Sequence, residues 1–197
     1  MKKLQALIIS LLLILTFAAE AKSPPPGTGK ADVPANIYIM LDTSGSMGAQ
    51  ITGSNSLYYP EDVAVDSNGN VYVVERYGHR IKKMDPSGNI IKTIGSYGYN
   101  RNGKFYYPTK IAIDTNDNIY VSDYTRIQKL NSDGVWQKNF TGQSRVRNVA
   151  VDSAGNVFAI NSSGRDLFKW NSSGSSEGGV SCGQSCYGLD EYNGTLY

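Results

Sequence analysis

The chain has 197 residues, a formal net charge of +2 and 18% charged residues. This near-neutral balance, without a run of basic residues or a basic amphipathic helix, gives no electrostatic basis for binding nucleic acid. One histidine and two cysteines do not make up a zinc motif.

The first 21 residues have the organisation of a secretory signal peptide. Two lysines precede an apolar run from Leu4 to Ala19, and Ala19-Glu20-Ala21 fits the small-x-small cleavage pattern. The apolar run is short for a bilayer span, so we expect cleavage after Ala21 rather than an N-terminal anchor. No later segment is apolar enough to cross a membrane. We therefore expect a secreted chain, destined for the periplasm, the cell surface or the medium, with no membrane span.

Residues 22–36 are rich in Pro, Gly, Lys and Ser and are expected to form a stiff, extended linker. In residues 37–56 an apolar strand, Ile37–Leu41, is followed by Asp-x-Ser-Gly-Ser. Asp42, Ser44 and Ser46 offer hard oxygen ligands from one loop, as Mg²⁺ prefers. This segment resembles the first strand and metal-ion-dependent adhesion site of a von Willebrand factor A domain. The resemblance implies Mg²⁺, or Ca²⁺, at these three residues.

The rest of an A domain is not recognisable after this motif, because a different repeat begins at residue 57. Three alternatives stay open. The repeats are an insertion in an A domain whose remainder lies beyond Tyr197, the motif is a vestige of domain shuffling, or a coincidental strand and polar turn packs on the repeats.

Residues 57–197 contain three copies of a ten-residue unit and the start of a fourth. The copies begin at Val63, Ile111, Val149 and Gly188, and their closing aromatic residues lie at positions 72, 120, 158 and 197. The spacings of 48, 38 and 39 residues are typical of a four-stranded propeller blade. Within each copy, alternating apolar residues, a turn such as Asn68-Gly69 and a β-branched run predict two strands joined by a hairpin turn.

Further strands follow in each unit, and no segment after the leader has a helical period. The third strands are predicted at Arg80–Met84, Arg126–Leu130 and Asp166–Trp170. The fourth strands are predicted at Asn89–Ile94 and Val135–Phe140, whereas the third unit ends in a looser Ser/Gly stretch. The fold class is therefore all-β, with blades at 57–104, 105–144 and 145–186 and a partial blade at 187–197.

The first unit resembles an NHL repeat in Tyr59-Pro60-Glu61-Asp62, in Gly69-Asn70-Val71-Tyr72 and in Gly78-His79-Arg80-Ile81. The second unit keeps Tyr-Pro and Arg-Ile but has Thr125 in place of His79, and the third unit lacks these elements. The resemblance implies a six-bladed propeller, used as a binding platform and sometimes as an enzyme. A propeller needs about four to eight blades. We therefore expect either a longer protein, of which this is the N-terminal part, or self-association of copies to close the ring.

Several recurring polar residues are expected to serve the fold. Asp66, Asp114 and Asp152 are predicted to bond backbone amides in their own turns rather than to bind calcium. Glu75 and Asp123 recur in the same way and receive the same interpretation. His79 is predicted to be a turn histidine that bonds to backbone.

The candidate binding residues are Tyr97, Tyr99 and Arg101, which lie in the long loop that stretches the first spacing. The pairs Tyr58-Tyr59 and Tyr106-Tyr107 are predicted to pack between blades. Cys182 and Cys186 are predicted to form a local disulfide, as expected for an exported chain.

These features predict a non-catalytic, secreted binding or adhesion scaffold for a protein or glycan partner, assisted by Mg²⁺ if the A-like motif is completed. The first alternative is an exported lyase or lactonase whose catalytic blades lie beyond this chain. Propeller enzymes of that kind use histidines or acidic metal ligands at the channel, and this sequence supplies no such set. A purely structural surface repeat is the second alternative.

Overall fold

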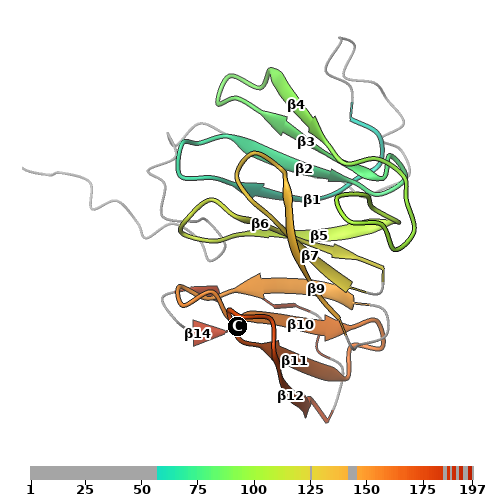
Figure 1. The fold of residues 1–197 in the computed structure, drawn as a ribbon, viewed down its shortest axis with the longest axis vertical. Helices are drawn as coiled ribbons and strands as arrows, with labels where there is room; N and C mark the ends of the chain where they lie inside the picture. Colours follow the sequence, from blue (N-terminus) through green and yellow to red (C-terminus); the bar gives the residue numbers. More distant parts are fainter. Residues whose placement is uncertain are drawn as a thin grey trace, which may run out of the picture.

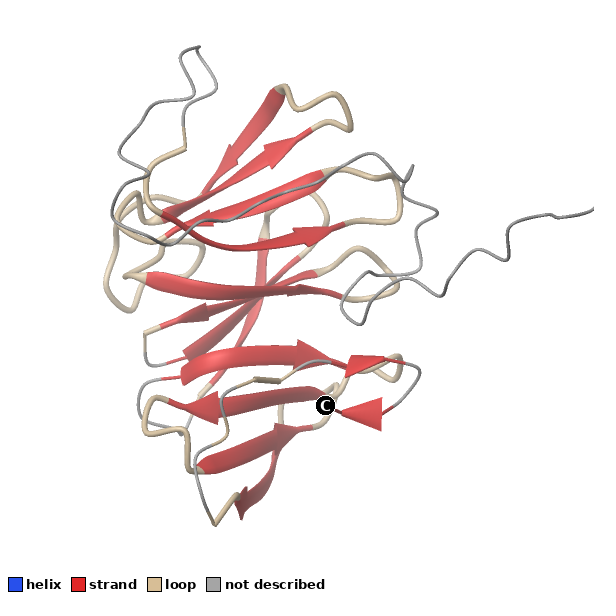
Figure 2. Ribbon diagram, turned by 180° about the vertical axis from the view of Figure 1, so that it is seen from behind, coloured by secondary structure: helices blue, strands red, loops and turns tan. Residues whose placement is uncertain are grey.

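The computed structural model describes residues 57–124, 126–141, 146–183, 186, 188–189, 191–192 and 195–196. In this part the chain forms strands and connecting turns (Figure 2), and no helix in it is long and apolar enough to cross a membrane. The predicted signal peptide, the linker and the A-like motif with Asp42, Ser44 and Ser46 lie outside the described residues.

Three four-stranded antiparallel sheets make up most of the described structure. The first contains β1 (Pro60–Val65), β2 (Val71–Glu75), β3 (Arg80–Met84) and β4 (Ile90–Ile94). The second contains β5 (Pro108–Ile113), β6 (Ile119–Asp123), β7 (Arg126–Leu130) and β8 (Trp136–Phe140). The third contains β9 (Val146–Val151), β10 (Val157–Asn161), β11 (Asp166–Trp170) and β12 (Ser176–Ser181). A short pair, β13 (Glu191–Tyr192) and β14 (Thr195–Leu196), stands at the start of the fourth unit.

The sheets follow one another as propeller blades, with β1 beside β5 and β5 beside β9 (Figure 1). The predicted all-β class is confirmed, and the three predicted third strands agree with β3, β7 and β11. We expected the third unit to end in an irregular Ser/Gly stretch. This expectation was wrong, because Ser176–Ser181 forms strand β12 and pairs with β11. All six residues of β12 are exposed, so this strand carries no apolar pattern by which a sequence could reveal it.

Each hairpin turn between the first two strands of a blade is organised by an aspartate. Asp66 Oδ1 accepts hydrogen bonds from the backbone amides of Asn68 and Asn70, at 3.0 and 2.8 Å. Its other oxygen accepts one from the Tyr72 hydroxyl at 3.0 Å. The predicted turn role is thus confirmed. Equivalent amide bonds recur at Asp114 and Asp152.

Apolar side chains fill the two interfaces between consecutive blades. Between the first and second blades the core consists of Tyr72, Val74, Ile81, Ile94, Phe105, Ile111, Ile119, Val121 and Leu130. Between the second and third it consists of Tyr120, Ile127, Phe140, Val146, Val149, Val151, Val157, Ala159 and Trp170. Face-to-face burial of these sheets removes the apolar side of each blade from water, which is the main stabilising term for stacked repeats.

A polar contact joins the innermost strands of the first two blades. Asp62 on β1 accepts hydrogen bonds from the Ile111 amide at 2.9 Å and from Lys110 Nζ at 3.3 Å, both on β5. The carboxylate thereby satisfies an edge amide that has no partner strand on that side.

Candidate functional site

Successive antiparallel strands bring several connections to the same end of the first two blades. These are the residues before β1, the β2–β3 turn, the loop from β4 to β5 and the β6–β7 turn (Figure 1). Aromatic rings from all four meet there in a continuous series, with centroid separations of 4.6 to 6.4 Å. We call this set the tyrosine cluster: Tyr58, Tyr59, Tyr77, His79, Tyr97, Tyr99, Tyr106, Tyr107 and Tyr124.

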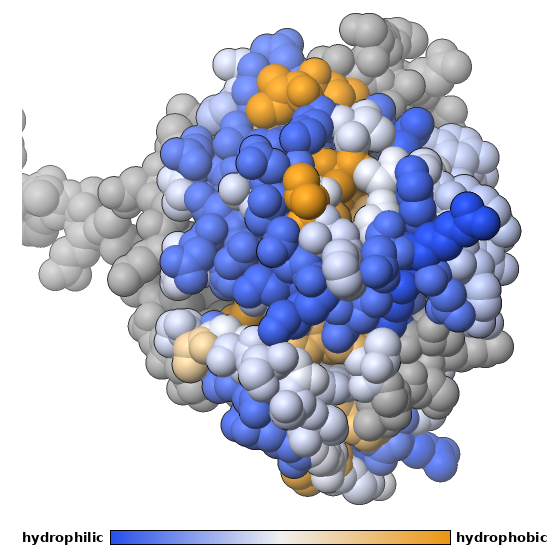
Figure 3. Space-filling model, viewed as in Figure 1, coloured by the Kyte–Doolittle hydropathy of each residue, from blue (hydrophilic) through white to orange (hydrophobic). Residues whose placement is uncertain are grey.

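The tyrosine cluster is strongly exposed. Five of its members, Tyr58, Tyr59, Tyr77, Tyr97 and Tyr99, have 48–65% of their surface accessible. The prediction that Tyr58-Tyr59 packs between blades was therefore wrong. Figure 3 shows a largely hydrophilic face with separate apolar patches. Since tyrosine is close to neutral in hydropathy, it is the ring contacts that reveal the site, and not a hydropathy map.

Two buried carboxylates hold the backbone where each blade begins. Glu75, at the end of β2, accepts the Tyr58 amide at 2.7 Å and pairs with Arg80 Nε. Asp123, at the end of β6, accepts the Tyr106 amide at 2.5 Å. The recurring acids thus have the predicted structural role. They also fix the first tyrosine of each Tyr-Tyr-Pro segment in place.

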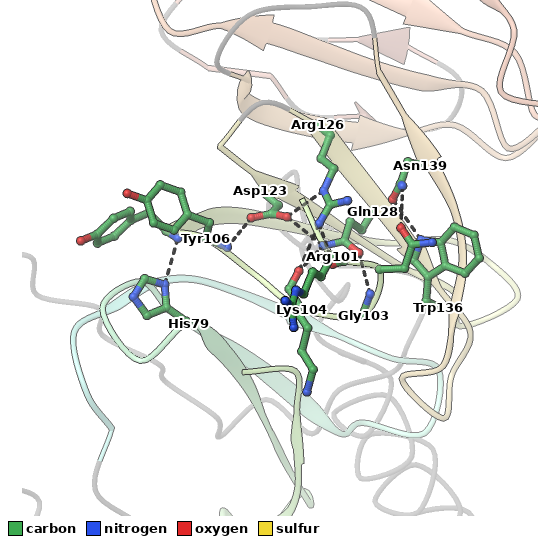
Figure 4. Close-up of polar contacts among 12 residues, drawn as sticks. His79, Arg101, Gly103, Lys104, Tyr106, Asp123, Arg126, Gln128, Trp136 and Asn139 are labelled. Atoms are coloured by element: carbon green, nitrogen blue, oxygen red, sulfur yellow. Dashed lines mark hydrogen bonds and ion pairs between the residues drawn. The ribbon is translucent and has the colours of Figure 1, made fainter. Parts of the chain in front are cut away.

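A second network clamps the long loop onto the second blade (Figure 4). Asp123 Oδ2 accepts hydrogen bonds from Arg126 Nε at 2.9 Å and from Gln128 Nε2 at 2.8 Å. Arg126 then donates to the Arg101 carbonyl at 2.7 Å, and Gln128 donates to the Lys104 carbonyl at 2.6 Å. Burial raises the pKa of Asp123, while the Tyr106 amide and Arg126 oppose that shift. The loop is therefore held by side chains of the adjacent blade.

Backbone strain accumulates at this end. Tyr59, His79, Tyr107 and Tyr124 have φ values of 49°, 53°, 50° and 51°, in the left-handed region that bulky residues avoid. Each such residue costs on the order of 1–3 kcal/mol, and such positions gather at functional sites because the surrounding structure must hold them.

His79 lies inside the tyrosine cluster. It bonds to a backbone amide, as predicted. Its Nδ1 accepts the Tyr107 amide at 3.1 Å, and its ring is nearly parallel to that of Tyr106 at 6.0 Å. Burial lowers the pKa of His79, opposed by the charge of Asp123. A neutral imidazole protonated on Nε2 suits this geometry, because Nδ1 must present a lone pair to the amide.

We expect this histidine to make the fold sensitive to mild acid. The unfolded chain binds the proton with a pKa near 6.5, whereas the folded pKa is lower. The stability that neutral His79 contributes is therefore fully present above pH 6.5. It is lost as the pH falls from 6.5 toward the folded pKa. Urea unfolding between about pH 7.5 and pH 5.5 should show a larger loss for the wild type than for His79→Asn.

Asparagine is the matched replacement because it tolerates positive φ and keeps an acceptor for the Tyr107 amide without titrating. Equal losses in the two proteins would mean that other groups, chiefly carboxylates, account for the acid sensitivity.

The structure brings Tyr97 and Tyr99 together but does not place Arg101 with them. Tyr97, Tyr99, Tyr106 and Tyr124 line an open hollow of about 400 Å³. The Arg101 carbonyl accepts the hydrogen bond from Arg126, and the Arg101 side chain is exposed. Sequence reasoning did not assign Tyr106 or Tyr124 to the site. The available signal was their position in the repeat. Tyr106 precedes the first strand of its blade, as Tyr58 does, and Tyr124 lies in the turn between the second and third strands, as Tyr77 does.

The cysteines lie at the equivalent end of the third blade. Cys182 and Cys186 form a disulfide with their Cα atoms 6.3 Å apart. Their amides donate to the carbonyls of Arg165 and Gly164 in the β10–β11 turn, at 2.7 and 2.5 Å. No aromatic cluster continues onto this turn in the residues that the structure describes, nor do three or more His, Cys, Asp or Glu side chains gather there to hold a metal.

Residues 57–84, which comprise β1 to β3, match the NHL repeat family. The first blade carries an NHL repeat. The structure is similar to that of Kuenenia stuttgartiensis hydrazine synthase, with a TM-score of 0.55 and 12% identity over 78% of this chain and 41% of that chain. It is also similar to virginiamycin B lyase from Staphylococcus aureus, with a TM-score of 0.50 and 13% identity over 64% of this chain and 42% of that chain.

These likenesses concern the propeller fold alone, because the identities are low. The chain spans about two fifths of the length of each of these two structures. No curated protein matches the sequence.

Proposed function

We propose that this chain is a non-catalytic binding scaffold whose tyrosine cluster contacts a protein or glycan partner. The observation that carries the proposal is the set of exposed, mutually packed tyrosines at one end of two blades. Tyrosine presents a large amphipathic surface at low entropic cost and dominates binding hot spots. Loops held on a rigid scaffold are where such surfaces are normally found.

The polar groups near the cluster support binding rather than chemistry. His79 uses Nδ1 as an acceptor for a backbone amide, so that nitrogen is already engaged. Glu75 and Asp123 are likewise occupied by amides and arginines. A general base or nucleophile must instead face a substrate. The alternative, an exported lyase or lactonase, would need catalytic groups from outside the part of the chain that the structure describes.

The proposal retains secretion through residues 1–21 and assistance by Mg²⁺ at Asp42, Ser44 and Ser46. These residues lie outside the described part, so both points stay predictions. Self-association of copies to close the ring also stays a prediction.

Glycan and peptide arrays probed with the full chain would test the scaffold function. We expect binding to one ligand class, and about thirtyfold or more weaker binding for Tyr97→Ala and Tyr99→Ala, because truncated hot spots cost about 2 kcal/mol or more. The control is Val135→Ala, a similarly exposed residue beside β8 in the turn at the other end of the blade. Binding that survives both tyrosine substitutions would place the partner elsewhere on the molecule.

A further inference from the structure

The hollow in the tyrosine cluster has the form of a box. Tyr106 is surrounded by Tyr97, Tyr99 and Tyr124, whose ring centroids lie 6.0, 5.2 and 5.2 Å from its own. Their planes make angles of 68°, 82° and 84° with the Tyr106 plane. Three rings therefore stand nearly upright around a fourth, and the four rings line an open hollow that a compact group can enter.

The base of this box is set by the fold. The Asp123 carboxylate holds the Tyr106 amide, and His79 stacks against the Tyr106 ring. The Arg126 and Gln128 side chains fix the loop that carries Tyr97 and Tyr99 (Figure 4). The backbone that carries Tyr97, Tyr99 and Tyr106 is thus held in place before any ligand arrives, which reduces the entropic cost of binding.

The electrostatics of the box favour a cation. Of the residues that the structure describes, those lining the hollow are all tyrosines. Partial desolvation, together with Tyr107, Tyr97, Tyr124 and Tyr99, raises the pKa of the Tyr106 phenol. That ring is therefore neutral at physiological pH and attracts charge through its quadrupole, whose negative lobe lies on the ring face.

The shape of the box selects among cations and against flat ligands. A sugar ring stacks best on a single open ring face, whereas perpendicular rings leave room for a rounded group. A methylated ammonium is rounded and weakly hydrated, so it loses little solvation on entering an aromatic site. A primary ammonium is more strongly hydrated and would lose more solvation on entering the same site.

We propose that Tyr97, Tyr99, Tyr106 and Tyr124 form an aromatic cage for a quaternary ammonium group, such as the trimethylammonium end of a choline-type ligand. This inference rests on the proposed binding function and names the chemistry recognised within the cluster. The hollow, about 400 Å³ in volume, falls in the usual range for small-ligand sites of about 300–1,000 Å³.

Choline and its neutral isostere, in which carbon replaces nitrogen, test the charge dependence directly. The full chain would be titrated with each compound, and binding would be followed by saturation transfer to the ligand methyl protons. We expect choline to bind and the isostere to bind clearly less tightly. Tyr99→Ala should weaken choline binding about three- to thirtyfold, whereas Tyr99→Phe should retain it. Val135→Ala should leave the affinity unchanged.

Equal binding of choline and the isostere would overturn the proposal, because the hollow would then be merely apolar. The proposal also fails if choline does not bind, or if Tyr99→Ala leaves its affinity unchanged. The scaffold function would survive any of these results provided that Tyr97→Ala or Tyr99→Ala still abolished binding on the glycan or peptide arrays. The two ideas can therefore fail separately.

Discussion

Asp123→Ala is expected to lower the free energy of unfolding by about 3–5 kcal/mol, the cost of removing one partner from a buried ion pair. The Arg126 side chain is only 6% exposed and would lose the carboxylate that compensates its charge. The Tyr106 amide and Gln128 Nε2 would lose the same acceptor. Because Arg126 and Gln128 also hold the long loop, the cluster should loosen together with the fold.

The first blade offers a matched control for this substitution. Glu75 pairs with Arg80 in the equivalent position, but the Arg80 side chain is 35% exposed and water can hydrate it once the partner is lost. Glu75→Ala should therefore cost less than Asp123→Ala in urea unfolding followed by tryptophan fluorescence. A double replacement by apolar residues, Asp123→Leu with Arg126→Met, should restore part of the loss. If Asp123→Ala proved no more harmful than Glu75→Ala, burial of Arg126 would not be the cause.

Gly95→Ala is expected to destabilise the protein by about 3 kcal/mol. Gly95 follows β4 with φ at +79°, a conformation that costs an L residue about 1–2 kcal/mol. A Cβ atom at this position would also overlap the ring of Phe105, which is fully buried in the core between the first two blades. Overpacking of this kind costs typically about 1–3 kcal/mol.

Gly88→Ala separates the two causes. Gly88 has φ at +85°, and a Cβ atom there would meet nothing within 4 Å. It should therefore show only the backbone cost, and the difference between the two variants measures the contact with Phe105. Combining Gly95→Ala with Phe105→Leu should recover part of that difference. Equal losses for Gly95→Ala and Gly88→Ala would show that the core relaxes around the added methyl group at no cost.

Much of the fold could be predicted from local sequence. The repeated Asp-x-x-Gly-Asn turn, the alternation of apolar residues and the aromatic at the end of each unit indicate strands and hairpins directly. These signals operate over a few residues, which is why Arg80–Met84, Arg126–Leu130 and Asp166–Trp170 agree with the observed strands. The outer strand β12 escaped prediction because an exposed edge needs no apolar side chains.

The candidate site could be predicted only in part. Tyr97 and Tyr99 were identified because they lie in an unusually long loop, and loops carry binding residues. The sequence does not show that Tyr106 and Tyr124 face the same hollow, since that depends on how two blades stack. Gln128 likewise looks like an ordinary polar strand residue until its burial against the Lys104 carbonyl is seen.

The sequence by itself therefore determined the all-β repeat, its turns and the role of its turn aspartates, because each depends on residues close together in the chain. Tertiary structure alone decided that tyrosines from four connections gather at one end, that Tyr58 and Tyr59 remain exposed, and that Asp123 clamps the loop. The physical reason is that antiparallel strands return alternate connections to the same end. Blade stacking then sets the distances among side chains far apart in sequence.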